Sequence, residues 1–363
     1  MKRRKESEGR TGNMQQDKKN SALSRVLWSI LFLIIAAATI WAVTSQNRSF
    51  SFPEFLAYIR RADLLPLLLA ALCAFGFVAI EALTLRCACQ PFGHKVPFGR
   101  GITYSSADIY FSAITPSATG GQPACAYFML QNGLSGTAVT AALLANLMMY
   151  TLALLVVGLL SFALSPGLFF SYGVFPKLLI LIGMATQALL AVFFTMLIRN
   201  ECLLRKLCLG VINFLSRLRL CRKRDKWVAR IERAMAEYGG CVRAMRNHRH
   251  VFGRLLLLNI LQRVSSISVT LFVYAATQGW SSLHKIWAMQ GFALVGSNAV
   301  PIPGAMGVSD YLMLCGFRQI MSEQAAANLE LLSRSLSFYF CIIFCGVWVL
   351  ASYLILRRRG KSC

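Results

Sequence analysis

The sequence predicts an all-α polytopic membrane protein with six full spans and two broken re-entrant helical hairpins. Hydrophobic residues make up 56% of the 363 positions and charged residues only 14%, whereas about a quarter of the residues in a soluble domain are charged. The charges also largely avoid six apolar runs, each close to the roughly 20 residues that a helix needs to cross a bilayer. These runs are Val26–Val43, Leu64–Leu85, Ala138–Leu164, Leu178–Ile198, Leu255–Ala276 and Leu336–Leu356.

Two further regions contain apolar segments that are too short to span and are separated by helix breakers. The first, Gly101–Leu130, is interrupted at Pro116–Pro123, and the second, Ile286–Gly316, is interrupted at Pro301–Gly307. Proline removes a backbone donor and ends a helix, and such backbone is tolerated at membrane depth only inside protein or along a wet cavity. We therefore expect two re-entrant hairpins, each with a second helix after the break. The alternative is that the prolines kink two ordinary spans.

The basic residues indicate the orientation of the chain. The net charge is +24, and the cations collect in three clusters, as the positive-inside rule produces, so nucleic acid is not an expected partner. We expect a multi-pass protein of the plasma membrane with a cytoplasmic tail (1–25), a membrane domain (26–356) and a second cytoplasmic tail (357–363). The first run is expected to be a retained anchor and not a cleaved signal peptide. The basic clusters are Lys2–Lys19, Arg199–Arg249 and Arg357–Lys361.

A span, a broken hairpin and a second span occur twice along the chain, at about 64–164 and 255–356. The predicted threading gives the two halves opposite orientations and joins them through the basic cytoplasmic segment 199–249. Inverted repeats with discontinuous helices are common in secondary transporters, which bind substrate between the breaks near the midplane. We therefore expect an inverted repeat whose two breaks approach each other within the membrane.

The breaks supply the predicted substrate site. The start of a helix exposes unpaired N–H groups and a partial positive charge, which suit a phosphate or a carboxylate, and glycine lets a head group approach the backbone closely. Replacing the carboxylate of this site by an amide, in Asp310→Asn, is expected to lower transport and to leave folding intact. The predicted substrate-binding residues are Pro116, Gly120, Gly121, Gln122, Pro301, Pro303, Gly304, Gly307 and Asp310.

Three further ionisable residues, Glu81, Asp108 and Arg263, are predicted to lie at membrane depth. Such residues usually face a protein interior or a cavity and mark a pathway. The alternative is a structural ion pair between Arg263 and one of the carboxylates. The asparagines expected to form hydrogen bonds between helices, and not to bind ligand, are Asn146, Asn259 and Asn298.

No metal, cofactor or catalytic residue is predicted. The chain has twelve cysteines and four histidines, but they do not recur at the spacing of a metal site. With the predicted topology no cysteine falls in an extracytoplasmic loop, so we expect reduced thiols that act as small apolar residues.

At the breaks the sequence resembles a known family. The Pro116–Gly121 turn, and above all the pattern Pro301-x-Pro303-Gly304-x-x-Gly307-x-x-Asp310, are similar to the membrane domain of lysylphosphatidylglycerol synthases, also called the flippase-like domain. The similarity extends over about Leu64–Leu356. Two departures concern the head group that is recognised. Asp310 stands where the family pattern generally ends in Glu, and Gln122 and Ala126 stand where many members have an acidic residue and then an Arg.

The resemblance implies a lipid translocator that moves a phospholipid or aminoacyl-phospholipid head group between leaflets, with the phospholipid substrate and anionic membrane lipids as partners. The alternative is a phosphatidylglycerol lysyltransferase, an enzyme of lipid metabolism and of resistance to cationic antimicrobials. Full-length members perform that reaction with a fused cytosolic domain. Here the longest hydrophilic stretch, Arg199–Arg249, has about 50 residues and no tRNA-binding signature, so enzymatic activity is not expected. A third hypothesis is a non-transporting membrane scaffold.

Overall fold

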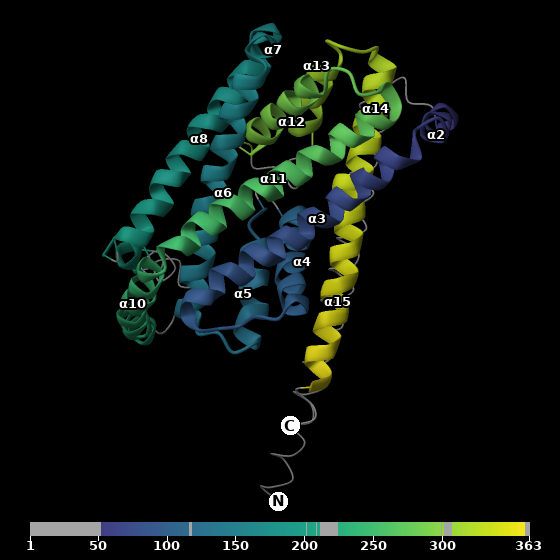
Figure 1. The fold of residues 1–363 in the computed structure, drawn as a ribbon. Helices are drawn as coiled ribbons and strands as arrows, with labels where there is room; N and C mark the ends of the chain where they lie inside the picture. Colours follow the sequence, from purple (N-terminus) through teal and green to yellow (C-terminus); the bar gives the residue numbers. More distant parts are fainter. Residues whose placement is uncertain are drawn as a thin grey trace, which may run out of the picture. The chain divides into compact units, whose positions relative to one another are not determined.

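A computed structural model describes residues 52–115, 118–200, 202–207, 209–210, 224–298, 300 and 307–359 (Figure 1). All regular secondary structure in these residues is helical. The chain divides into two compact units, and the described residues all belong to the second, Phe50–Cys363. The predicted span Val26–Val43 and the tail 1–25 lie outside the described residues. The same is true of Pro116, Pro301, Pro303 and Gly304.

Five helices of the described part are long and apolar enough to cross a membrane, and they correspond to the other five predicted spans. Three of them are single helices. The first continues from α3 into a short 3₁₀ turn (η1, Gln90–Phe92), and the last is a continuous run of α14, a π-helical turn (η4) and α15. The helix that contains the predicted span Leu336–Leu356 begins earlier, at Glu323. The bounds are α3 Leu64–Cys89, α6 Gly136–Leu164, α8 Val174–Arg199, α11 Arg249–Gln278, α14 Glu323–Arg334, η4 Ser335–Phe340 and α15 Cys341–Arg359.

Two hairpins of short helices occupy the regions that the sequence marks as broken. The first consists of α4 (Phe98–Ile114) and α5 (Gly121–Gln131), and the second of α12 (Leu283–Ser297) and α13 (Val308–Phe317). Their lengths of 17, 11, 15 and 10 residues fall short of the roughly 20 needed to span. Short helices separated by a break are therefore present in both halves, as predicted.

The first break is shorter than the sequence suggests. We expected Pro116–Pro123 to be non-helical, but Gly121, Gln122 and Pro123 form the first turn of α5. Proline is tolerated in a first turn because its missing N–H would have no partner there. At the second break, Gly307 takes the left-handed conformation (φ +83°) and α13 begins at Val308, the predicted position.

The two halves pack against each other with opposite directions. Their first helices, α3 and α11, form the most extensive helix pair of the described part, and Figure 1 shows them side by side. The pair is antiparallel, because Asp63 N at the start of α3 donates to Ala276 O near the end of α11 (2.9 Å). One further pair of contacts is equivalent in the two halves, since α4 packs on α15 and α12 packs on α6. An inverted repeat would produce these contacts, and the repeat itself stays a prediction.

The other described helices lie outside this repeat. The span α8 follows the first half and packs against α6 and α12. The helix α10 belongs to the basic segment and packs against α6. These additional helices are α2 Phe52–Arg60, η1 Gln90–Phe92, α7 Pro166–Ser171 and α10 Arg224–Asn247.

The contact of α8 with α12 gives a direct test of the packing. A Cβ at Gly183 would lie 2.3 Å from Val295 O, a backbone atom that cannot move aside on its own. We therefore expect Gly183→Ala to lower the free energy of unfolding by about 1–3 kcal/mol. Unfolding of the purified protein in detergent, followed by heat or by SDS titration, measures this change.

The matched control is Gly253→Ala in α11, where a new Cβ meets nothing within 4 Å. Because alanine favours helix over glycine, this variant should be as stable as the wild type or more stable by up to about 1 kcal/mol. Equal unfolding midpoints for Gly183→Ala and the wild type would contradict the described contact.

Candidate functional site

Ionisable and amide side chains from both halves meet at the α3–α11 contact. Glu81 of α3 is only 5% exposed. It accepts a hydrogen bond from Asn146 Nδ2 of α6 (3.3 Å) and another from the side chain of Gln262 of α11. Asn259 of α11 extends the network, because its Nδ2 donates to Asn146 Oδ1 (3.1 Å). A carboxylate is thus held among amides in the interior of the spans.

Arg263 lies on the same helix as Gln262 and Asn259 and is 7% exposed. Its guanidinium lies 5.1 Å from the ring centroid of Phe77 and 5.0 Å from that of Tyr150, which are cation–π contacts. It interacts electrostatically with Glu81. Among the described residues, however, no carboxylate forms an ion pair with it, and its Nε has no hydrogen-bond partner. The direct ion pair considered as an alternative is therefore not formed in the described part.

Asp108 of α4 faces the first break. Gln122 Nε2 in the first turn of α5 donates to both of its oxygens at 3.2 Å, and Ser112 Oγ donates to Oδ1 at 3.4 Å. The carboxylate also interacts electrostatically with Glu81 and, more weakly, with Arg263. Asp108, Glu81 and Arg263 therefore belong to one connected group. We call Glu81, Asp108, Asn146, Tyr150 and Arg263 the central polar cluster.

The glycines of the first break serve the packing of the protein itself. A Cβ at Gly121 would lie 2.0 Å from Ser112 Oγ and 2.2 Å from Asp108 Oδ1. A Cβ at Gly120 would lie 2.6 Å from Thr115 Cγ2. We expected Gly120 and Gly121 to leave room for a head group, but this space is filled by α4 of the same hairpin. Gly307 differs, since nothing lies within 4 Å and its positive φ is what favours glycine there.

The central polar cluster also reaches the second break. Tyr150 OH donates to Asn298 Oδ1 (3.2 Å), and Asn298 is the C-cap residue directly after α12. A chain of polar groups thus connects Gln122 at the first break with Asn298 at the second. The prediction that Asn146, Asn259 and Asn298 bond neighbouring helices is confirmed.

Asp310 lies in a second charged cluster, formed with Glu330 and Arg334 of α14. Its Oδ2 accepts from Gly307 N (3.0 Å) and caps α13, while its Oδ1 accepts from Arg334 Nε (2.5 Å). The same Nε lies 3.3 Å from Glu330 Oε1. The substrate-binding role of Asp310 stays a prediction, and the structure gives this residue a structural role as well. Sequence reasoning missed Glu330 and Arg334, although their i, i+4 spacing in an apolar region is a usable signal.

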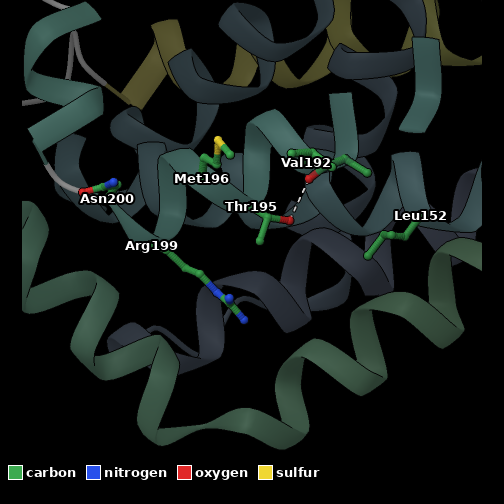
Figure 2. A pocket seen from close by; sticks show the side chains of 7 residues that line it. Leu152, Val192, Thr195, Met196, Arg199 and Asn200 are labelled. Atoms are coloured by element: carbon green, nitrogen blue, oxygen red, sulfur yellow. Dashed lines mark hydrogen bonds between the residues drawn. The ribbon is translucent and has the colours of Figure 1, made fainter. Parts of the chain in front are cut away.

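A surface groove of about 440 Å³ lies on a different part of the molecule (Figure 2). Its walls are mostly apolar, and Arg199 at the end of α8 is its one cation. None of the predicted site residues lines it. The lining residues are Leu152 of α6, Ala191, Val192, Thr195, Met196 and Arg199 of α8, and Asn200. Within the described residues no group of three or more His, Cys, Asp or Glu side chains could hold a metal ion.

The chain matches the family described as the lysylphosphatidylglycerol synthase TM region over residues 26–345. The match includes both hairpins, the central polar cluster and the second charged cluster. No curated protein matches the chain. The family match agrees with the resemblance at the two breaks and identifies a membrane protein of lipid metabolism.

The second charged cluster predicts a large effect of removing its cation. Arg334→Ala would leave two buried carboxylates, Asp310 and Glu330, without their counter-ion. Breaking a buried pair in this way typically costs about 3–5 kcal/mol, so we expect a strong loss of stability in detergent unfolding. For the same reason Asp310→Asn, which we expected to spare folding, should also destabilise the protein.

The control is the exposed pair of Arg318 and Glu323, at 2.6 Å, whose side chains are 48% and 67% exposed. Removing an exposed pair changes stability by about 0–1 kcal/mol, so Arg318→Ala should unfold almost as the wild type does. A similar small effect of Arg334→Ala would contradict the buried pairing.

Proposed function

Because the chain belongs to the lysylphosphatidylglycerol synthase transmembrane-region family, we propose that it moves the head group of a phospholipid between the two leaflets of the plasma membrane. The observation that carries this proposal is the central polar cluster. Its side chains come from both predicted repeat halves, and it contains a buried guanidinium whose Nε has no partner in the described part of the chain.

The energetics of the membrane support this proposal. A charged side chain at the centre of a spanning helix costs at least about 2.5–3.5 kcal/mol on insertion scales. A purely structural use of such groups would pair them directly, as Arg334 is paired with Asp310. Arg263 is instead placed by two rings, which leaves donor capacity for another group. We infer that this group is the phosphate of a lipid head group.

The inverted arrangement supplies a way to expose this cluster to either leaflet. In transporters with inverted repeats, one half rocks against the other around a fixed central site. Here several polar contacts of the cluster join the halves, since Asn146 bonds Asn259 and Tyr150 bonds Asn298. Rocking of one half against the other would break and re-form these hydrogen bonds between the halves. A scaffold without transport would have no use for a guanidinium left without a direct ion pair.

Replacement of Arg263 tests the proposed role. We expect Arg263→Gln to lower the rate of lipid translocation roughly 10- to 100-fold, because a hydrogen bond to a charged group contributes about 1.5–3 kcal/mol. The rate is measured in proteoliposomes of the purified chain, by the loss of fluorescence when a membrane-impermeant reductant reaches acyl-labelled anionic, zwitterionic or cationic phospholipids in the outer leaflet.

The matched control is Arg254→Gln, which removes an exposed cation from the same helix and should translocate lipid at the wild-type rate. Unchanged transport in Arg263→Gln would contradict the role of this residue. Vesicles of wild-type protein that move no lipid faster than protein-free vesicles would contradict the proposed function. Formation of lysyl-lipid from charged tRNA by the purified chain would favour the synthase instead.

The proposed topology predicts different labelling at the two ends of α8. Cys202, an exposed thiol just after this helix, should react with an impermeant maleimide only after the cells are permeabilised, because the basic segment is expected in the cytoplasm. In a variant without other cysteines, Gly173→Cys, in the exposed turn before α8, should react in intact cells. Labelling of Cys202 in intact cells would overturn the proposed orientation.

A further inference from the structure

The central polar cluster contains more carboxylates than cations. Glu81 and Asp108 carry two negative charges when ionised, and Arg263 carries one positive charge, so the sum is one negative charge. Asn146 and Tyr150 of the cluster are neutral. The other described polar side chains that bond or interact with its members are neutral too. They are Ser112 of α4, Gln122 and Cys125 of α5, Asn259 and Gln262 of α11, and Asn298 after α12.

The surplus charge belongs to Asp108. The cation Arg263 acts chiefly on Glu81, whereas the charge that acts most on Asp108 is the carboxylate of Glu81. The two residues also differ in burial, because Glu81 is 5% exposed and Asp108 is only partly buried. Within the described part of the chain, Asp108 is therefore the carboxylate that lacks a dedicated counter-charge.

The hydrogen bonds around the carboxylates leave acceptors without donors. Gln122 donates through Nε2 to Asp108, but its own Oε1 is buried and has no partner among the described residues. Gln262, which is 2% exposed and bonds Glu81, likewise has an Oε1 without a donor. A buried acceptor without a donor is destabilising. One additional proton in the cluster would neutralise the surplus negative charge and would supply a donor for one of these acceptors.

We propose that Asp108 binds one proton and that lipid translocation is coupled to the binding and release of this proton. The proton joins the carboxylate from water on one side of the membrane and leaves to water on the other, so no further reactant is required. This inference rests on the proposed function. It adds the coupling ion and the residue that carries it.

The position of Asp108 explains how a proton changes the conformation. The ionised carboxylate accepts from Gln122 and lies against the first turn of α5, whose N–H groups and partial positive charge favour an anion. The protonated acid loses this attraction but can donate its own O–H to Gln122 Oε1 after the amide turns over. Proton binding thus weakens the electrostatic attraction between Asp108 of α4 and the first turn of α5, and proton release restores this attraction.

The second charged cluster has the same composition but a different geometry. Asp310 and Glu330 face a single cation, yet the Nε of Arg334 lies within 3.3 Å of an oxygen of each. In the central polar cluster no ion pair of this kind is found among the described residues. This compact pairing distinguishes the second charged cluster from the central polar cluster, in which Asp108 has no ion-pair partner among the described residues.

A pH gradient across proteoliposomes tests the coupling. The full chain is reconstituted with a trace of acyl-labelled phospholipid, and valinomycin with equal potassium on both sides holds the membrane potential at zero. If one proton moves with each lipid, a gradient of about one pH unit should shift the steady-state leaflet ratio about tenfold, since one unit corresponds to a factor of ten in equilibrium. Asp108→Asn should abolish this shift, and the leaflet ratio should no longer depend on pH.

The matched control is Glu323→Gln, which neutralises an exposed carboxylate and should keep the wild-type shift. Wild-type transport that ignores the pH gradient, or that follows a sodium gradient instead, would overturn the coupling and leave the proposed function standing. Wild-type vesicles that move no lipid would overturn both.

Infrared difference spectra between acid and alkaline buffer test the proton site without transport. The purified wild-type protein in detergent should show the carbonyl band of a protonated buried carboxylic acid, and this band should be lost in Asp108→Asn and kept in Glu323→Gln. A band that persists in Asp108→Asn, or that is missing from the wild type, would overturn the assignment to Asp108.

Discussion

The antiparallel packing of α3 against α11 is the contact that positions the rest of the described structure. Small residues make this contact close, and a Cβ at Gly76 would lie 2.9 Å from Ser265 Oγ. Ser265 Oγ in turn donates to the backbone oxygen of Cys73 (2.7 Å). In a membrane, close approach of small residues and polar contacts between helices replace the hydrophobic effect as the source of association. Because α3 carries Glu81 and α11 carries Arg263, the same contact also sets the position of the carboxylate relative to the cation.

Much of this architecture follows from the sequence, because a long apolar run has few alternatives to a helix in lipid. Five spans and both hairpins agree with the prediction for the same reason. The sequence was less informative at Pro123, which was interpreted as part of the break. A proline ends a helix only where its N–H is needed, and in the first turn of α5 it is not needed. The helix that contains the last span extends beyond the predicted apolar run, because Glu330 and Arg334 interrupt that run in the sequence but pair with each other in the structure.

The candidate site could be predicted only in part. The ionisable residues Glu81, Asp108 and Arg263 were recognisable as single charges in apolar surroundings. Their mutual arrangement depends on how α3, α4 and α11 pack, which a single sequence does not determine. The glycines of the first break could not be interpreted from the sequence either. A glycine leaves space beside the backbone, but the sequence does not say what fills that space. In the structure, Asp108 and Ser112 of the neighbouring helix fill it at Gly121.

The two arginine clusters show why one of them is the better candidate for a moving site. Arg334 uses its Nε on Asp310 and Glu330, and Asp310 also caps α13, so this cluster fixes the second hairpin to α14. The guanidinium of Arg263 lies instead over the rings of Phe77 and Tyr150. An aromatic face attracts a cation through its own charge distribution, so the two rings hold this guanidinium without a carboxylate partner. They therefore keep a buried cation in place without an ion pair, and its Nε, which has no partner among the described residues, can serve a polar group that comes and goes.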